Sequence, residues 1–219
     1  MFLHTHPYPP FIFDSTTKLI VGTLPPPRFT MGILKPKDVC FCYGSSDGYL
    51  WPILNAIFNL NLKYETTEDA ITQRKQFLIE RGIGICDIVA SANREKIDAS
   101  DLGMQDVKFR DLIAILQKYP KIDTLLFTGG NSKNGPEYFF RKHIATYHCK
   151  LEVVSNEVPR IHQFELPNTK RKIKTVSLTA PSGAANRAVG SLQNYKEMKA
   201  KFPSKNTIDF RIEQYRPFF

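Results

Sequence analysis

Short apolar runs that alternate with amphipathic segments are the feature that most constrains this chain. Lys18 to Thr23, Thr124 to Thr128 and Ile173 to Leu178 are short and rich in β-branched and aliphatic residues, which predicts buried strands. Segments between them, such as Thr67 to Arg81, carry apolar residues at helical spacing. This alternation favours a three-layer α/β/α fold with a mostly parallel, four-stranded central sheet and helices on both of its faces.

The same patterns predict further elements. Strands are expected at Asp38 to Tyr43, Ile83 to Val89 and Lys150 to Val154, and helices at Tyr49 to Leu60, Asp106 to Tyr119, Glu137 to Thr146 and Ala185 to Lys201. Asn156 to Arg171 lacks periodicity and is expected to be a surface excursion. The 219 residues fit a single domain, with the first ~15 and last ~17 residues as appendages that are weakly ordered or pack on its surface.

Composition excludes several classes of protein. No apolar run approaches the roughly 18 residues that span a bilayer, and residues 1 to 7 lack the basic and apolar regions of a secretory signal, so a soluble intracellular protein is expected. The four cysteines are too few for a disulfide scaffold, and buried thiols are expected instead. Neither Cys40 and Cys42 nor the histidines have the spacing of metal ligands, so no metal is predicted.

The basic charge is concentrated in the C-terminal part of the chain. The formal net charge is +9; residues 133 to 219 carry 16 basic and 7 acidic side chains, whereas residues 1 to 132 carry 14 of each. A one-sided excess is what a face that binds a polyanion needs, because neutralised phosphates release counterions. A solvated hairpin end at Lys170 to Lys174 is the alternative explanation for part of it.

Unusual residues follow four of the predicted strands. They are Gly22 to Pro27, Tyr43 to Gly48, Asp87 and Thr179 to Asn186. In a doubly wound sheet, loops at the carboxyl ends of the strands converge on one crevice. Gly129 to Gly135 fails the spacing of a phosphate-binding loop and is predicted to be a strand-to-helix turn near that crevice.

In their order along the chain, these segments resemble the motifs of the uracil-DNA glycosylase superfamily, most closely its hypoxanthine-DNA (deoxyinosine) glycosylase group. Gly22-Thr23-Leu24-Pro25 is similar to the first motif, Tyr43 with Trp51 to an aromatic pair, Gly82 to Ser91 to the base-recognition strand, and Leu178 to Asn186 to the second motif. The resemblance spans Leu19 to Asn194.

This resemblance implies a monofunctional DNA glycosylase of base-excision repair. Such an enzyme flips a deaminated base, hypoxanthine or uracil, out of DNA and hydrolyses its N-glycosidic bond. The resemblance further implies a monomer without cofactor, cytoplasmic and nucleoid-associated in a bacterium or archaeon, with damaged DNA as its partner and no membrane contact.

The resemblance also implies roles for individual residues. Tyr43 is expected to stack on the flipped base, and Asp87 to accept its ring N–H in a pocket completed by Gly22 and Thr23. A core tyrosine, and a carboxylate that caps a turn or pairs with Arg94, are the structural alternatives. Asp47 is expected to orient the attacking water, although an aspartate in a Ser-Ser-Asp-Gly turn is also ordinary turn chemistry.

The DNA contacts are expected from Pro25, Ser182, Asn186 and Arg187, with a helix cap as the alternative role of Asn186. Several branches of the superfamily place an aspartate or asparagine in the first motif to activate water, but Thr23 and Leu24 stand there in this chain. This departure fits the hypoxanthine-specific group, and the resemblance to that group implies Asp47 and Asp87 as the catalytic residues. A non-catalytic nucleic-acid or nucleotide-binding protein with the same fold is the main rival, and a hydrolase of free nucleosides is a third hypothesis.

Overall fold

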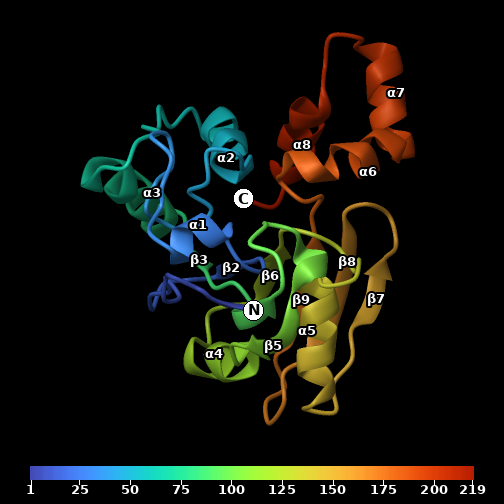
Figure 1. Cartoon of the computed structure of the whole chain (residues 1–219). Helices are drawn as coiled ribbons and strands as arrows, with labels where there is room; N and C mark the ends of the chain where they lie inside the picture. Colours follow the sequence, from blue (N-terminus) through green and yellow to red (C-terminus); the bar gives the residue numbers. More distant parts are fainter.

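A six-stranded mixed sheet lies at the centre of the molecule, whose computed structural model describes residues 1–219 (Figure 1). In spatial order its strands are β3 (Ile83–Ile85), β2 (Lys18–Val21), β6 (Thr124–Phe127), β9 (Lys172–Ser177), β8 (Arg160–Glu165) and β7 (Glu152–Ser155). The first four are parallel, and β8 and β7 are antiparallel to their neighbours. The predicted four-stranded sheet is therefore wrong in extent, because a hairpin adds two strands beside β9.

The parallel strands are apolar throughout because both faces of the sheet are covered. Leu19 and Val21 of β2 are completely buried against one layer, which contains α4 (Leu112–Lys118) and α5 (Pro136–Ala145). Ile20 points to the opposite layer, with α2 (Leu50–Phe58) and α3 (Glu68–Glu80). Alternate residues of a strand point to opposite faces, so a strand between two helical layers needs apolar residues at every position.

One predicted helix follows its sequence signals closely, and a four-residue helix that was not predicted follows the first motif. Thr67 caps α3 by accepting a hydrogen bond from the backbone N–H of Ala70, and Gly82 follows the helix with a φ of +63°. The short helix α1 (Pro27–Thr30) has Pro27 in its first turn, a position that tolerates proline because no N–H is needed there. The prolines after the first motif therefore start a helix.

A second, antiparallel sheet has the order β1-β4-β5 and consists of β1 (Phe2–Thr5), β4 (Val89–Arg94) and β5 (Gln105–Phe109). The predicted strand Ile83 to Val89 is wrong in extent, because the chain leaves one sheet after Ile85 and enters the other at Val89. The predicted helix from Asp106 is also wrong at its start. Residues 105–109 pair with β4, and Asp111 caps α4 by accepting a hydrogen bond from Ala114 N–H at 3.0 Å.

The strand predicted at Asp38 to Tyr43 is a tight turn instead. Val39 N–H donates to the carbonyl of Gly44 at 2.8 Å, and Tyr43 has a φ of 57°. A Cβ on Gly44 would lie 1.9 Å from the carbonyl oxygen of Val39, so only glycine fits there. The surface excursion predicted at Asn156 to Arg171 is wrong as well. This segment contains β8, and every residue of β8 pairs with a residue of β9.

The C-terminal part forms a helical group that Figure 1 shows beside the ends of β8 and β9. It consists of the 3₁₀ turn η2 (Gly183–Ala185), α6 (Asn186–Ser191), α7 (Gln193–Lys201) and α8 (Thr207–Tyr215). The single helix predicted over Ala185 to Lys201 is broken at Leu192, whose φ and ψ are −67° and 136°. α8 packs against α2 and buries Arg211 and Tyr215 completely.

All four cysteines are free thiols; Cys42 and Cys86 are buried, Cys149 is half-buried and Cys40 is exposed. The expectation of buried thiols therefore fails for Cys40. No helix combines the length and the apolar character that crossing a bilayer requires.

Candidate active site

The break between β3 and β4 places Asp87 at the centre of a buried polar cluster. Its Oδ1 accepts hydrogen bonds from the backbone N–H of Gly22 at 2.7 Å and from the hydroxyl of Tyr43 at 2.8 Å. Its Oδ2 lies 2.9 Å from Nε2 of His6. The side chain is almost fully buried, so these donors replace the water that its charge would otherwise need. Arg94, an alternative partner, bonds to His4 instead.

His6 contributes a fixed tautomer to this cluster. Its Nδ1 accepts a hydrogen bond from the backbone N–H of Tyr8 at 3.1 Å, so that nitrogen carries no proton. The proton of the neutral ring is therefore on Nε2, where it is donated to Asp87. His6 is thus a satisfied histidine whose function is to hold the carboxylate in place.

Gly22 is required by the crowding around it. A Cβ on this residue would lie 2.2 Å from the Tyr43 hydroxyl, 2.8 Å from Asp87 Oδ1 and 2.9 Å from Thr128 Oγ1. The Tyr43 hydroxyl also lies 3.1 Å from Thr128 Oγ1. Burial, followed by the charge of Asp87, raises the pKa of Tyr43 well above its usual range, so its hydroxyl keeps its proton. The structure therefore brings Gly22, Tyr43 and Asp87 together, as predicted.

A cavity of about 610 Å³ opens beside this cluster. Its wall includes Thr128 and Gly129 after β6, Ser177 and Thr179 at the end of β9, and Asp101 from a different segment. Thr128 belongs to both the cavity wall and the Asp87 cluster. The cavity thus lies at the carboxyl ends of two central strands, where open α/β sheets bind their ligands.

Asp101 lies in the 3₁₀ turn η1 (Asp101–Gly103), between β4 and β5. Its Oδ1 accepts a hydrogen bond from the hydroxyl of Thr23 at 2.8 Å. The amide of Asn134 donates to the backbone carbonyl of Asp101 at 2.9 Å, which ties η1 to the loop before α5. Burial raises the pKa of the Asp101 carboxyl to about 6, against the lowering effects of Thr23 and Arg94. Thr23, predicted to bind the base, is thus the partner of a carboxylate.

A second buried carboxylate, Glu137, lies at the start of α5 behind the cavity wall. It accepts hydrogen bonds from Ser177 at 2.6 Å, Arg141 at 2.8 Å and Arg160 at 2.9 Å. Burial opposes its charge, but these bonds and the two guanidinium charges lower the pKa of Glu137 below its usual value. One carboxylate therefore accepts from two arginines, of which Arg160 lines the cavity.

The loop from Thr179 to Asn186 is held by α8. Arg211 donates to the backbone carbonyls of Ala180 at 2.9 Å and Ser182 at 3.1 Å, and to Oδ1 of Asn186 at 2.9 Å. The side chain of Asn186 is therefore used within the protein, where it steadies the loop and does not cap the helix. The Ser182 hydroxyl makes no hydrogen bond, and Arg187 is exposed without a partner.

Asp47 lies apart from the cavity and from the Asp87 cluster. Its carboxylate is 58% exposed and pairs with Arg28 at 3.1 Å and Lys35 at 2.7 Å. Arg28 is itself held by two hydrogen bonds to the buried Asp38. The neighbouring Gly48 pairs with Ser182 in an isolated β-bridge, so the Asp47 loop lies beside the loop of the second motif, but no hydrogen bond or ion pair joins Asp47 to Asp87 or to the cavity wall. Pro25 is half-buried in the connection between β2 and α1.

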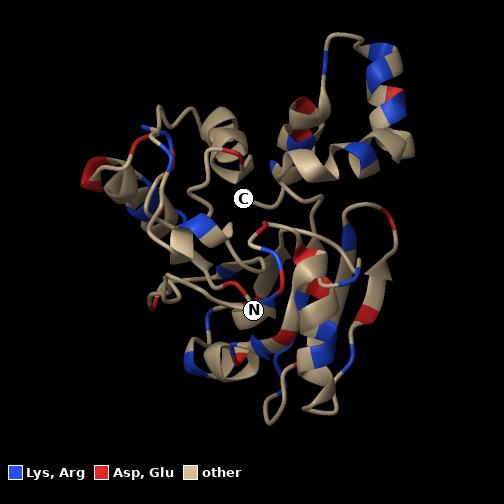
Figure 2. Ribbon diagram, viewed as in Figure 1, with Lys and Arg blue, Asp and Glu red and all other residues tan.

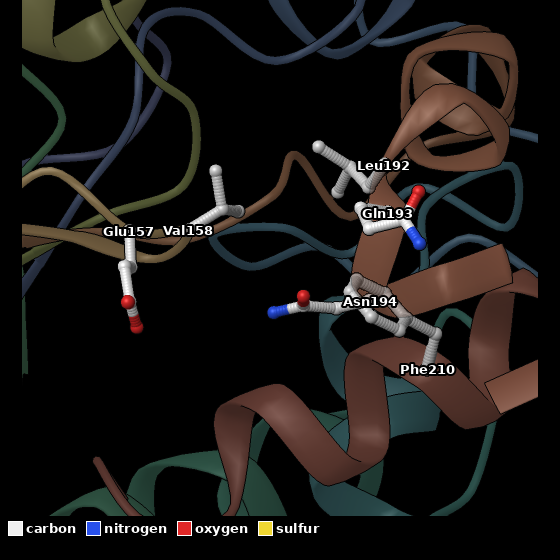
Figure 3. A pocket seen from close by; sticks show the side chains of 6 residues that line it. All are labelled: Glu157, Val158, Leu192, Gln193, Asn194 and Phe210. Carbon is white, nitrogen blue, oxygen red and sulfur yellow. The ribbon is translucent and has the colours of Figure 1, made fainter. Parts of the chain in front are cut away.

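A smaller cavity of about 280 Å³ adjoins the first, and the two share Val158 and Leu192 in their walls. Figure 3 shows the side chain of Asn194 between Phe210 and Glu157 in this space. No group of three or more histidine, cysteine, aspartate or glutamate side chains is arranged to hold a metal ion.

No protein-family model matches this chain, and no curated protein matches its sequence. Among solved structures, it is similar to the solution NMR structure of a protein from Methanosarcina acetivorans described as a putative uracil DNA glycosylase. The TM-score is 0.54 at 17% sequence identity, and the match covers 96% of this chain and 99% of that one. This likeness shows that the two proteins share an α/β fold.

Sequence analysis missed Asp101, Thr128 and Arg160. Thr128 ends a predicted strand, so its position was a usable signal. Asp101 stands in a stretch without periodicity, and nothing local indicates that it reaches Thr23. Arg160 lies in the segment that was expected to be an excursion.

Proposed function

We propose that this chain is a DNA glycosylase that flips a deaminated base, hypoxanthine or uracil, out of DNA and hydrolyses its N-glycosidic bond. The observation that carries the proposal is the buried Asp87 cluster, joined through Thr128 to a cavity at the carboxyl ends of β6 and β9. The fold shared with a protein described as a putative uracil DNA glycosylase supports it.

Asp87 suits the recognition of a base. A carboxylate has about four acceptor positions, and three are occupied by Gly22, Tyr43 and His6. One position remains for a donor from outside, and both uracil and hypoxanthine present a ring N–H. The three fixed donors orient the carboxylate before the base arrives, so little reorganisation is needed on binding.

Tyr43 suits stacking because its orientation is fixed. Its hydroxyl is held by Asp87 and Thr128, whereas part of the residue remains accessible. Stacking of a base on an aromatic ring contributes roughly 1–3 kcal/mol. In the proposed complex, the ring supports the face of the flipped base while Asp87 binds its edge.

Ser182 and Arg187 suit contacts with the DNA backbone. Both side chains are free of partners; Ser182 lies on the loop whose carbonyls are fixed by Arg211, and Arg187 lies in the first turn of α6. Figure 2 shows further basic residues along α7, which are Lys196, Lys199 and Lys201. A rigid loop with a free hydroxyl and a nearby guanidinium can bind phosphates without the loss of conformational entropy that ordering a flexible loop would cost.

Base release is the direct test of this proposal. Oligonucleotides that contain one deoxyinosine, one deoxyuridine or no lesion would be incubated with excess protein, and alkali cleavage at abasic sites would be measured. We expect cleavage only with a lesion, and its loss in Asp87→Ala. Asp69→Ala is the matched control, because that carboxylate is 76% exposed on α3.

The rival function predicts a different outcome. A non-catalytic binding protein would leave every oligonucleotide intact while still binding DNA with an affinity that falls steeply with salt. Cleavage of free deoxyinosine or deoxyuridine, with none of the oligonucleotides cleaved, would favour the nucleoside hydrolase.

A further inference from the structure

Asp101 is a carboxylate in the cavity wall that is only partly satisfied. One oxygen accepts the Thr23 hydrogen bond, and the other has no partner in the protein, although it is not sealed from the cavity. Its backbone is anchored twice, since Asn134 donates to the carbonyl of Asp101 and Arg94 donates to that of Ser100 at 2.6 Å. The free oxygen is therefore held in a defined place.

The other carboxylates near the site are paired or lie outside this cavity, and the exposed Glu157 lines only the smaller adjoining cavity. Glu137 is completely buried and serves two arginines and Ser177. Asp87 has three donors, and Asp47 is exposed and paired with two cations outside the cavity. Asp101 is thus the acidic side chain of the cavity with an oxygen available to a water molecule.

We propose that Asp101 is the general base of the glycosidic hydrolysis, accepting a proton from the attacking water on its free oxygen. This inference rests on the proposed glycosylase function. It gives a specific role to a residue that lies outside all the motifs of the sequence, and the Thr23 hydroxyl is its positioning partner.

The step balances as a hydrolysis. The bond between the sugar C1′ and the base nitrogen breaks, and its electron pair leaves with the base. The water oxygen forms a new bond to C1′ and gives one proton to the Asp101 carboxylate. That proton then passes to solvent or to the departing base, which restores the carboxylate for the next turnover.

The electrostatic surroundings of Asp101 suit this task. Burial is the largest influence and raises its pKa to about 6, and the negative charge of Asp87 adds to the rise. The Thr23 hydrogen bond and the positive charge of Arg94 act in the opposite direction. Arg94 is further flanked by His4 and Asp98. A carboxylate with a pKa near the working pH is ionised at neutral pH and is a stronger base than an ordinary aspartate.

The test compares Asp101→Asn with wild type and with Asp69→Asn, which changes a carboxylate that is 76% exposed on α3. Single-turnover rates of base release would be measured from pH 5 to 9 on the oligonucleotide that wild type cleaves, together with DNA affinity. We expect Asp101→Asn to lower the rate constant about 100- to 10,000-fold with affinity within about threefold. Asp69→Asn should stay close to wild type, whose rate should fall tenfold per pH unit below about pH 6.

A thermal unfolding series separates a catalytic from a structural role. Because burial of its charge opposes folding, Asp101→Asn should raise the melting temperature at pH 8, whereas loss of a structural contact would lower it. Base release by Asp101→Asn within threefold of wild type would overturn the role of Asp101 alone. A wild-type protein that releases no base from any lesion would overturn the glycosylase function, and this inference with it.

Discussion

Asp87 lies just before β4 and Asp101 lies in η1 beyond it, yet the surroundings of the two carboxylates differ. Asp87 is almost fully buried, and three of the roughly four acceptor positions of its carboxylate receive a hydrogen bond. Asp101 has a single donor, and burial raises its pKa to about 6. The surroundings of Asp87 fix the position of its carboxylate, whereas those of Asp101 favour a change of its protonation state.

This contrast shows that two aspartates of one site can suit different roles because their surroundings differ. Donors that satisfy a carboxylate fix its direction and stabilise its charge, which suits the reading of a hydrogen-bond pattern. Desolvation with few donors weakens the preference for the charged form, which suits proton transfer near neutral pH. The predictions below change one member of this pair or its partners.

Removal of Asp87 should have the largest effect on stability. Asp87→Ala leaves the Gly22 N–H, the Tyr43 hydroxyl and the His6 Nε2–H without their acceptor in a buried place. We expect a loss of about 3–5 kcal/mol in the free energy of unfolding, measured by urea denaturation. A loss below about 1 kcal/mol would show that water replaces the carboxylate, and the cluster would not be a rigid reader.

Asp101→Asn should change stability in the opposite direction. Because the folded-state pKa of about 6 lies above the usual aspartate pKa of 3.8, stability is lost as the pH rises between these values. The neutral variant escapes this loss, so its unfolding free energy should exceed that of wild type by about 1–2 kcal/mol at pH 8 and equal it near pH 4. Equal stability at both pH values would mean that Asp101 is not desolvated.

Tyr43→Phe should separate the hydroxyl from the ring. The variant loses the hydrogen bonds to Asp87 and Thr128 but keeps an aromatic face. We expect a loss of about 1 kcal/mol in unfolding free energy, and base release that is reduced far less than in Tyr43→Ala. Equal losses of base release in the two variants would assign the role of Tyr43 to its hydroxyl and remove the stacking proposal.

The elements around this pair could be predicted from the sequence where local signals agree with the fold. β2, β6 and β9 are apolar because both faces of the sheet are covered, and α3 carries its cap and its terminal glycine. The Asp87 cluster was partly predictable, because a lone carboxylate within an apolar run needs partners. Its partner His6 was not, since 81 residues separate the two in the chain.

The remainder depends on contacts between distant segments. β8 has apolar residues three positions apart, at Ile161 and Phe164, and its buried His162 lies 3.0 Å from Arg141 of α5, which no local pattern indicates. β5 offered a usable signal, because Val107 and Phe109 alternate with polar neighbours, but the helical spacing that follows masked it. Asp101 reaches the cavity only because β4 and β5 form a separate sheet that carries η1 to Thr23.

Asp47→Asn should have the smallest effect. It changes a carboxylate outside the cavity and so serves as a comparison for Asp87 and Asp101. Its carboxylate is exposed and bound to Arg28 and Lys35, and exposed ion pairs contribute about 0–1 kcal/mol. Arg28 keeps its two bonds to Asp38, so the loop should persist, and we expect a change of unfolding free energy below about 0.5 kcal/mol. Because Asp47 lies outside the cavity wall, base release should stay within about threefold of wild type. A loss of a hundredfold or more, with normal stability, would instead require the loop around Asp47 to close over the bound DNA, and water activation would return to Asp47.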